Sequence, residues 1–421
     1  MQYHIIVFGC QMNISDAERI SAVLETAKYK NTEDINKADL IVVTMCSVRQ
    51  SAVDRVQGLI QKFEQIKGKN PKLKTILTGC VLKRDKKIFL ELFDYVVDIK
   101  DIKKIPEIIG SKKISNKDNY LDITPKYSSK FSASVPIMTG CNNFCSYCVV
   151  PYAREREISR STKKIILEIK NLIKNGYKEI WLLGQNVNSY KDKNTNFPQL
   201  LKKVNNIQGN FWIRFTSSHP KDFNSQVIEA MANCQKVTHY LNLPIQSGDD
   251  KVLKSMNRHY TVKEYKNKIK ELREKIPDIC LSTDIIVGFP GETKKGFNNT
   301  VKLFRDVKYD MAYINKYSAR AGTAAAKLKD NVLWEEKKRR EKVLNETLKQ
   351  TALENNKKYI GKTVEVLVDS RKGSRLFGKT KEYKTIEINP VMQRGTQYRI
   401  GEFIKVKVTN AGPWKITGNL L

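Results

Sequence analysis

The stretch Cys141-Asn142-Asn143-Phe144-Cys145-Ser146-Tyr147-Cys148 decides how the rest of the chain is interpreted. It carries three cysteines at C-x3-C-x2-C spacing in one short loop, directly after an apolar run that predicts a strand at 134–138. Three thiolates at this spacing can converge on one small object. They are one ligand fewer than the four cysteines of an ordinary four-iron cluster, so one iron would keep an open position. Structural zinc needs four ligands, and no second C-x2-C pair follows here. The spacing therefore favours an iron–sulfur cluster over a zinc site or three structural thiols.

The same loop resembles the signature of the radical S-adenosylmethionine (radical SAM) enzymes, in which an aromatic residue, here Tyr147, precedes the third cysteine. The longer run from Met138 to Arg154 is similar to that of the methylthiotransferases within this superfamily. This resemblance implies that Cys141, Cys145 and Cys148 hold a [4Fe-4S] cluster. It also implies that the open iron binds the amino and carboxylate groups of S-adenosyl-L-methionine (SAM).

Length and composition limit the possible classes of protein. A chain of 421 residues predicts two or three domains. No run approaches the roughly 18 apolar residues of a membrane span, and the N-terminus lacks the features of a secretory signal. We therefore expect a cytoplasmic protein whose eight cysteines are metal ligands or reactive thiols. The net charge of +32 indicates a polyanionic partner such as RNA, although 58 of the 76 basic residues are Lys, which base bias in a genome would also produce.

Predicted strands alternate with helices in the first 125 residues, which predicts a parallel α/β sheet. The strands are expected at 3–8, 39–44, 74–78 and 95–99. The pattern Ser15-x-x-Glu18 is a capping box and predicts that the first helix begins there.

Three cysteines of this part each lie just past the carboxyl end of a predicted strand, where parallel sheets bind ligands. They are Cys10, Cys46 and Cys80. The alternative is three unrelated buried cysteines, which are common. The segments 9–13, 44–49 and 78–80 resemble the cysteine motifs of the methylthiotransferase N-terminal domain. The resemblance implies a second, auxiliary [4Fe-4S] cluster held by these three residues.

The central part, residues 130–357, continues with strand–helix units. Further strands are predicted at 179–183, 211–216, 240–245, 281–287 and 311–317, and helices near 162–175, 222–233, 262–275 and 294–307. With the strand before the cysteine loop this makes about six repeats, fewer than the eight of a full barrel. The residues alone predict an α/β fold with parallel strands; the resemblance implies a partial (β/α)6 barrel.

Polar, glycine-containing loops follow several of these predicted strands. Glycine allows the backbone to approach an adenine or a ribose closely. Each loop alone is a weak signal, but all of them resemble methylthiotransferase motifs, and the first corresponds to the motif that meets the SAM amino group. We expect five loop residues near SAM or the substrate: Gly184, Gln185, Ser217, Gln246 and Asp284.

A few residues stand outside these motifs. Cys234 and Cys280 have no cysteine neighbours and are predicted to lie in or near the core. His219 is interpreted as a polar residue of the barrel rim. Glu155 stands where close relatives usually carry Gly, and Ile158 where they usually carry Arg, which bears on the shape of the loop after the cysteines.

The C-terminal part, residues 358–421, changes in character. A charged stretch at 334–359 predicts a connecting helix, and short β-rich runs then follow at 363–369, 385–388 and 402–409. The last 65 residues hold 14 Lys or Arg against 5 Asp or Glu. This pattern fits a small five-stranded, OB-like barrel and resembles the TRAM domain, an RNA-binding module. Tyr383, Tyr398 and Trp414 are candidates for stacking on bases or for the barrel core.

The resemblance covers nearly the whole chain, with parts at 1–125, 130–357 and 358–421 in the family's order. It implies transfer of a methylthio group to C2 of N(6)-dimethylallyladenosine beside the tRNA anticodon. A SAM-derived radical removes the hydrogen, the auxiliary cluster supplies sulfur, and a second SAM supplies the methyl group. The implied partners are the tRNA anticodon stem-loop and an electron donor such as flavodoxin or ferredoxin, with a monomer expected and no membrane.

Other functions remain open at this point. Related branches act on threonylcarbamoyladenosine in tRNA or on an aspartate of a ribosomal protein, but the runs Gly9 to Asn13 and Cys46 to Arg49 favour the dimethylallyladenosine branch. A non-catalytic iron–sulfur RNA-binding protein is the alternative of another class, and a zinc-binding RNA module is a third.

Overall fold

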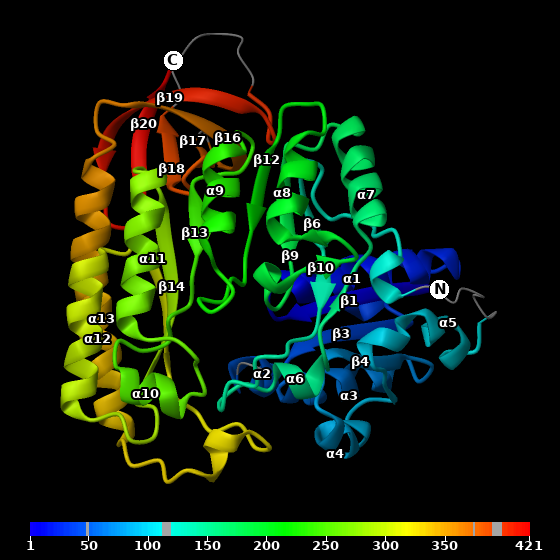
Figure 1. Cartoon of the computed structure of the whole chain (residues 1–421). Helices are drawn as coiled ribbons and strands as arrows, with labels where there is room; N and C mark the ends of the chain where they lie inside the picture. Colours follow the sequence, from blue (N-terminus) through cyan, green and yellow to red (C-terminus); the bar gives the residue numbers. More distant parts are fainter. Residues whose placement is uncertain (48–49, 112–118, 374, 390–397) are drawn as a thin grey trace.

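The computed structural model describes residues 1–421 apart from 48–49, 112–118, 374 and 390–397. Val48 and Arg49, which contributed to the choice of branch, therefore lie outside the described residues. Figure 1 shows the chain running from a blue N-terminal sheet, through green and yellow central strands and helices, to a red and orange barrel at the opposite end. None of the helices described is long and apolar enough to cross a membrane.

The N-terminal part is a five-stranded parallel sheet of order β2-β1-β3-β4-β5, as the alternation of strands and helices predicts. Every residue of the central strand β3 is buried, because helices cover both faces of the sheet. The strands are β1 (Gln2–Phe8), β2 (Lys30–Asn31), β3 (Leu40–Cys46), β4 (Lys74–Cys80) and β5 (Tyr95–Val96), and the helices are α1 (Gln11–Thr26), α2 (Gln50–Gln57), α3 (Ile60–Lys69), α4 (Lys86–Leu90) and α5 (Ile105–Ile108).

Helix α1 begins four residues before the start that the Ser15-x-x-Glu18 pattern predicted. Cys10 is its N-cap, and the carboxamide oxygen of Asn13 accepts a hydrogen bond from the Cys10 N–H at 3.3 Å. Glu18 instead accepts hydrogen bonds from the N–H and the hydroxyl of Ser128, at 2.9 and 2.7 Å. The capping-box prediction was therefore wrong, because Glu18 binds the segment that leads into the central part.

Six parallel strands form the central part, and a helix follows each of them. They lie in two three-stranded sheets, β6-β9-β12 and β13-β14-β15, joined by a parallel bridge between Ile213 and Val237. Among the described strands, β6 and β15 do not pair, so the barrel stays open between them, which confirms the partial (β/α)6 architecture. The strands are β6 (Ser132–Pro136), β9 (Glu179–Leu183), β12 (Trp212–Phe215), β13 (Tyr240–Asn242), β14 (Cys280–Val287) and β15 (Met311–Lys316).

The barrel helices agree with the sequence pattern except for α8, which was not predicted. They are α7 (Thr162–Lys174), α8 (Phe197–Asn205), α9 (Ser225–Asn233), α11 (Val262–Lys275), α12 (Lys294–Val307) and α13 (Trp334–Lys357). The remaining short elements are β7 (Met138–Thr139), α6 (Val150–Ala153), β8 (Ile158–Ser159), β10 (Lys191–Asp192), β11 (Thr195–Asn196) and α10 (Asp250–Ser255). Helix α13, predicted as a connecting helix, also completes the barrel as its sixth helix, since Leu344 and Leu348 lie in the barrel core. Cys234 and Cys280 are buried, as predicted.

The C-terminal part is a closed barrel of order β16-β17-β18-β20-β19, which confirms the predicted five-stranded barrel. Alternate residues fill its interior, among them Val366, Ile386, Val406 and Ile416. Its strands are β16 (Thr363–Lys372), β17 (Arg375–Thr380), β18 (Thr385–Asn389), β19 (Phe403–Ala411) and β20 (Ile416–Leu420).

This barrel docks on the amino ends of the central strands. Its Tyr383 packs against Tyr240, the first residue of β13, with ring centroids 4.6 Å apart. Arg214 pairs with Glu179, the first residue of β9, at 2.6 Å and donates to the Thr380 carbonyl at 2.9 Å. The carboxyl ends of the same strands, which carry the cysteine loop and the predicted SAM residues, therefore face away from the barrel.

The three aromatic residues of the C-terminal part have different surroundings. Tyr383 belongs to the contact with the central strands rather than to the barrel core, so the structure leaves its ring no face for a base. Tyr398 packs against the barrel core, whereas Trp414 is 55% exposed. Of the three, Trp414 is the residue whose side chain is most exposed.

Candidate active site

The cysteine loop folds back on itself after β7. Gly140 has a φ of +83°, and a Cβ there would lie 2.1 Å from the Arg156 carbonyl oxygen, so the position requires glycine. The carboxamide of Gln185 accepts a hydrogen bond from the Gly140 N–H at 2.6 Å. The Cys141 N–H donates to the Glu155 carbonyl at 3.0 Å. These contacts fix the loop against the end of β9.

Cys141, Cys145 and Cys148, here called the loop set, are half-buried. Burial, together with negative charge on Cys145 and Cys141, raises the pKa of the Cys148 thiol to about 12. Burial also raises the pKa of Cys141. Such thiols stay protonated near neutral pH on their own, whereas bound metal deprotonates them.

A buried arginine that the sequence analysis missed approaches the loop set. Arg258, 113 residues downstream of Cys145, donates to its Sγ at 3.5 Å. The same guanidinium donates to the hydroxyl of Tyr260 at 2.5 Å and to the carbonyl of Pro244. No local pattern marks Arg258, because only the fold brings it to the loop.

Cys10, Cys46 and Cys80, here called the sheet set, lie at one edge of the N-terminal sheet. Cys46 and Cys80 end β3 and β4 and are register partners, and Cys10 follows β1. Cys46 and Cys80 are buried, whereas Cys10 is exposed. A hydrogen bond with Cys46, and then burial, raise the pKa of the Cys80 thiol well above its ordinary value. The pKa of the Cys10 thiol is also raised, by the desolvating surroundings of its sulfur and then by the charge of Cys80, although the residue as a whole is exposed.

Asn13 joins the three loops that carry the sheet set. Its carboxamide accepts from the Cys10 N–H and donates to the Met45 carbonyl at 3.2 Å. Gly79, with a φ of +101°, allows the third loop to approach, because a Cβ there would lie 2.6 Å from the same Met45 oxygen. Asn13 lies in a motif that the sequence analysis recognised, but its role became visible only in the structure.

A second buried arginine connects the two cysteine sets. Arg154 follows α6, is 2% exposed, and comes from the segment directly after the loop set. Its Nε donates to Cys80 Sγ at 3.0 Å and its Nη1 to the Tyr120 hydroxyl at 3.2 Å, while its Nη2 pairs with Asp16. Each set therefore has one sulfur that faces a buried guanidinium.

The loops after β9 and β12 carry three of the predicted SAM residues. A Cβ on Gly184 would lie 2.6 Å from Cγ of Met138, so the backbone passes close to β7. Gln185 contacts Gly140 at the start of the cysteine loop. Ser217 has a φ of +64°, and its carbonyl accepts from the Val187 N–H at 3.2 Å. The structure therefore brings these two loops together beside the loop set.

Of the other two predicted SAM residues, Asp284 lies on β14, and Gln246 lies after β13 and forms an isolated parallel bridge with Ile285. The N–H of Gln246 donates to the carbonyl of Asp284 at 2.9 Å, and Gln246 has a φ of +77°. The Asp284 carboxylate accepts from the Asn242 carboxamide at 3.2 Å. These residues form a second pair on the same rim.

Buried polar atoms without hydrogen-bond partners gather on the rim. Among the described residues they include the side-chain atoms Asn186 Oδ1, Gln246 Oε1 and His219 Nε2. His219 Nδ1 accepts from the Lys221 N–H at 3.2 Å, which places the proton on Nε2, and burial lowers the pKa of His219 to about 2. A buried polar atom left unpaired costs about 1–3 kcal/mol. Such a group of atoms is expected where a polar ligand such as SAM binds.

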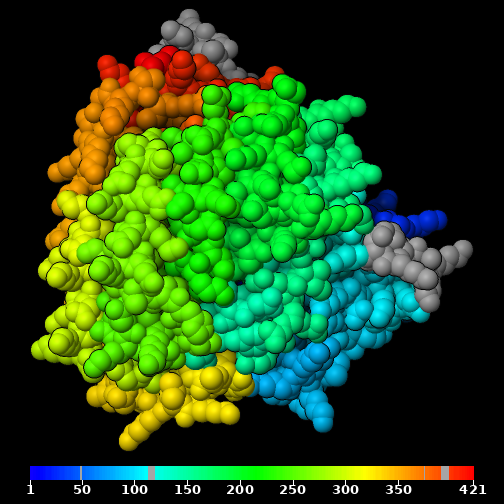
Figure 2. Space-filling model, viewed as in Figure 1, coloured from blue at the N-terminus to red at the C-terminus, as the bar shows by residue number. Residues whose placement is uncertain are grey.

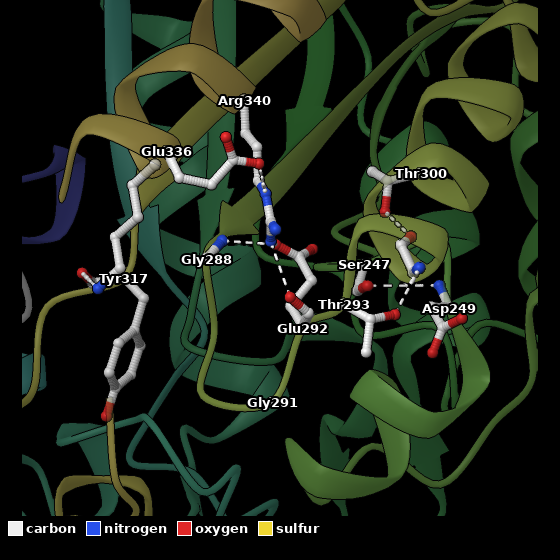
Figure 3. A network of polar contacts seen from close by, with 12 residues as sticks. Ser247, Asp249, Gly288, Gly291, Glu292, Thr293, Thr300, Tyr317, Glu336 and Arg340 are labelled. Atoms are coloured by element: carbon white, nitrogen blue, oxygen red, sulfur yellow. Dashed lines mark hydrogen bonds and ion pairs between the residues drawn. The ribbon is translucent and has the colours of Figure 1, made fainter. Parts of the chain in front are cut away.

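The glycine-rich run Gly288–Thr293, in contrast, uses its polar groups internally, as Figure 3 shows. Glu292 is buried and accepts from the Gly288 N–H at 2.6 Å and from Arg340 at 2.6 Å. Thr293 caps α12 by accepting from the Gly296 N–H at 3.1 Å. This run therefore shapes the rim and presents little to a ligand.

A cavity of about 370 Å³ opens beside the segments that follow Cys80 and Cys148, and none of the six cysteines lines it. Its walls come from three segments: the one after Cys80, the one after Cys148 and the one around Gly322. Arg320 of the last segment donates to Gln50 of the N-terminal part, and Figure 2 shows this yellow region reaching toward the blue and cyan N-terminal part. The lining residues are Leu82, Lys83, Arg84, Val149, Pro151, Tyr152, Glu155, Ala321 and Gly322.

The described part of the chain holds one compact group of possible metal-ion ligands, and it lies outside both cysteine sets. Among the described residues, the group with ligand atoms within 4.8 Å of one another is His239, Asp278 and Glu382, and neither cysteine set is that compact. A single zinc ion would need sulfurs within about 4.6 Å, twice the Zn–S bond length. Hydroxyls of Thr44 and Thr78 beside the sheet set are buried without partners in the described part of the chain, which leaves donors for an occupant.

Three family models match the chain. The Radical SAM superfamily matches residues 135–304, an uncharacterized protein family, UPF0004, matches residues 2–99, and the TRAM domain matches residues 357–421. Solved structures with a similar fold include the radical S-adenosylmethionine methyltransferase TsrM from Kitasatospora setae, with a TM-score of 0.55 at 13% identity over 77% of both chains. Another is the cobalamin-dependent radical enzyme OxsB, with a TM-score of 0.54 at 10% identity over 83% of this chain and 56% of that one.

Curated relatives match the chain over its full length. It is 41% identical over 441 residues to the tRNA-2-methylthio-N(6)-dimethylallyladenosine synthase of Clostridium botulinum strain Hall, covering 99% of this chain and 96% of the relative. It is 39% identical over 443 residues to the protein of the same name from Thermoanaerobacter sp. strain X514, covering 100% and 93%. The chain therefore belongs to the radical SAM methylthiotransferase family, in the branch of the tRNA-2-methylthio-N(6)-dimethylallyladenosine synthases.

Proposed function

We propose that this protein transfers a methylthio group to C2 of N(6)-dimethylallyladenosine in tRNA. The observation that carries the proposal is the presence of two three-cysteine sets, each at the carboxyl ends of parallel strands, in a chain whose full-length relatives bear this activity in their names. Family membership implies a [4Fe-4S] cluster and SAM. The reaction needs a hydrogen removed from an aromatic carbon, and such a hydrogen is not acidic enough for acid–base catalysis.

We assign the first cluster to the loop set and a second, auxiliary cluster to the sheet set. When bound, the two clusters and SAM supply the electron, the radical, the sulfur and the methyl group of the reaction. Three ligands per cluster leave one iron open in each, for SAM at the loop set and for sulfur chemistry at the sheet set. Burial of Cys46 and Cys80 and partial burial of Cys148 support this assignment, because they limit the access of water to the proposed centres.

The rim residues hold and orient SAM in this proposal. The unpartnered atoms Gln246 Oε1 and His219 Nε2 supply one acceptor and one donor, and Gln185 holds the cysteine loop in place through Gly140. Ser217 and Asp284 complete the two loop pairs that face the cofactor. Gly184 lets the backbone approach it closely.

The cavity beside the segments that follow Cys80 and Cys148 is the proposed entry site of the nucleoside. Leu82, Val149 and Pro151 form an apolar wall suited to a dimethylallyl group. Tyr152 is 47% exposed and offers a ring for stacking on the base. Lys83 lies on the same wall, where it suits a backbone phosphate. The C-terminal barrel, with its excess of basic residues, would bind the tRNA further away.

The partners and the organisation of the protein follow from this reaction. Electrons must come from a low-potential protein such as flavodoxin or ferredoxin, and the place of work is the cytosol, where tRNA and reduced thiols occur. We keep the division into parts at 1–125, 130–357 and 358–421, and a monomeric state, as working proposals.

The decisive experiment is mass spectrometry of tRNA nucleosides from cells that lack the gene, with and without the chain restored. The expected result is that 2-methylthio-N(6)-dimethylallyladenosine returns with the intact chain and with Cys234→Ala, a matched control that removes a buried cysteine outside both sets. It should not return with Cys148→Ala. Methylthiolation of threonylcarbamoyladenosine instead would overturn the substrate, and no change in any nucleoside would reject tRNA and favour the ribosomal protein or a non-catalytic role.

A further inference from the structure

We propose that Arg154 is a positioning residue that couples the two cysteine sets, by holding the Cys80 sulfur from the segment that begins at Cys148. The inference rests on the auxiliary cluster proposed above. In this inference, Arg154 keeps the sheet set, which provides sulfur, aligned with the loop set, where the radical forms.

The contacts of Arg154 all run from the central part to the N-terminal part. Its three donor nitrogens reach Cys80 Sγ at 3.0 Å, the Tyr120 hydroxyl at 3.2 Å and the Asp16 carboxylate. All of these partners are buried or nearly so. A guanidinium offers its donors in a rigid plane, so three simultaneous partners fix both its position and its orientation. The Cys80 sulfur is thereby tied to a residue outside its own sheet.

The link from Arg154 back to the loop set is short and stiff. Only Val149 and the helical turn α6 (Val150–Ala153) separate it from Cys148. The N–H of Arg154 closes that turn by donating to the Val150 carbonyl at 2.8 Å. A movement of the cysteine loop is therefore transmitted to the guanidinium, and through it to Cys80.

The next residue strengthens the same link. Glu155 pairs with Lys100 and, at 3.4 Å, with Lys83, both from the N-terminal part. Its φ of +62° is left-handed, which a non-glycine residue rarely adopts. This accounts for the glycine that relatives usually carry there, and the two ion pairs offset part of the strain in this chain. Two consecutive side chains therefore bridge the parts on either side of the cavity.

The chemistry of the Arg154 contact goes beyond joining two parts of a fold. A hydrogen bond donated to a cluster-ligating sulfur stabilises negative charge on it, and such bonds are among the determinants of cluster potential. Asp16 neutralises the charge of the guanidinium, while Cys80 accepts the buried Nε–H, so the donor that the fold must satisfy is directed at a sulfur of the sheet set. An arginine that served only as an interdomain contact could be replaced without a change at the metal.

The test isolates the auxiliary cluster in the full chain, by replacing Cys141, Cys145 and Cys148 with Ala, and measures its iron content, EPR spectrum and reduction potential. Arg154→Gln is expected to retain iron, change the spectrum and shift the potential to more negative values. Arg258→Gln is the matched control, because it removes a buried guanidinium from the other set and should leave all three readings unchanged. Arg154→Lys, which keeps the charge but not the three-way contact, should shift the potential in the same direction by less.

In the intact enzyme, Arg154→Gln should lower the methylthio product formed per SAM cleaved by about tenfold, the usual lower range for outer-shell partners of a metal site. An unchanged spectrum and potential with full iron content would overturn the inference. If Arg154→Gln fails to fold, the same readings on Arg154→Lys decide. Absence of iron in the starting Cys-to-Ala background is a different failure, which would reject the auxiliary cluster itself.

Discussion

The loop set and the sheet set bring three cysteines together in opposite ways. The loop set lies within eight consecutive residues, and its shape is maintained by local backbone bonds and a glycine at Gly140. The sheet set comes from three strands, and its shape is maintained by strand register, by Asn13 and by Arg154. The comparison teaches that a local site tolerates movement of its surroundings, whereas an assembled site depends on every element that aligns it. The sheet set is therefore the more easily disrupted of the two.

The largest effect should come from removing one ligand from each set. We expect Cys148→Ala to abolish both 5′-deoxyadenosine formation and methylthio transfer, by at least about 10³-fold or about 4 kcal/mol. Cys46→Ala should abolish transfer alone, with SAM cleavage retained. Chromatography of both products from the reconstituted enzyme measures this. Equal loss of SAM cleavage in the two variants would contradict the assignment of SAM cleavage to the loop set and of sulfur supply to the sheet set.

The second effect concerns the buried ion pair that supports the sheet set. Asp16→Ala leaves the guanidinium of Arg154 buried without a counter-charge, and both side chains are 1% exposed. Breaking such a pair costs about 3–5 kcal/mol of the free energy of unfolding. Asp306→Ala, which breaks the exposed pair with Lys266, should cost about 0–1 kcal/mol. Urea unfolding of both variants provides the comparison, and equal costs would contradict it.

A third effect concerns His219 on the rim beside the loop set, and is seen in how the stability of the protein depends on pH. Burial lowers the pKa of His219 to about 2 in the folded protein, against about 6.5 in the unfolded chain. Between pH 7 and pH 5 the unfolded chain gains a proton that the folded protein does not, so the folded protein loses about 2 kcal/mol of stability. His219→Gln should remove this part of the pH dependence. Urea unfolding of both proteins at pH 7 and pH 5 measures how far the free energy of unfolding falls between the two pH values. An equal fall in the wild type and in His219→Gln would argue against a buried neutral imidazole.

A fourth measurement tests whether the unpaired polar atoms of the rim bind SAM. Gln246→Leu removes the partnerless Oε1 and should raise the Kd for SAM about tenfold, or about 1.4 kcal/mol, with no loss of stability. Glu292→Gln serves as the control, because its network is internal (Figure 3) and its loss should lower stability without changing the Kd. Calorimetric titration with SAM measures both. A stability loss without a change in Kd would make Gln246 a structural residue.

The smallest effect is expected at Glu155, the residue directly after Arg154. Glu155→Gly relieves a left-handed backbone that costs about 1–2 kcal/mol and removes exposed ion pairs worth about 0–1 kcal/mol. We therefore expect the stability to change by no more than about 1 kcal/mol, and the product formed per SAM cleaved to fall far less than in Arg154→Gln. A fall as large as that of Arg154→Gln would transfer the coupling role to Glu155.

Much of the fold was predictable because its signals are local. Strands such as Glu179–Leu183 and helices such as Val262–Lys275 agree with the predicted bounds, since apolar periodicity and caps lie within each segment. Helix α1 shows the limit of local signals. Its start was misjudged because Glu18 is engaged by Ser128, and because a cysteine rather than a serine is the cap. The contact of Tyr383 was missed for the same reason, as it involves a strand far away in the sequence.

The sequence by itself determined the chemistry of this protein: the residue types, their spacing in the loop set, and their place after each strand of the sheet set. These are properties of short segments, and spacing along the chain limits directly where thiols can lie. Only the tertiary structure decided which groups support the sulfurs. Arg154, Arg258 and Asp16 come from distant positions, and a guanidinium or carboxylate becomes costly and therefore specific only when burial removes it from water. Burial is a property of the assembled chain, which is why no local pattern revealed the contacts of these side chains, not even for Arg154, which ends the recognised run from Met138.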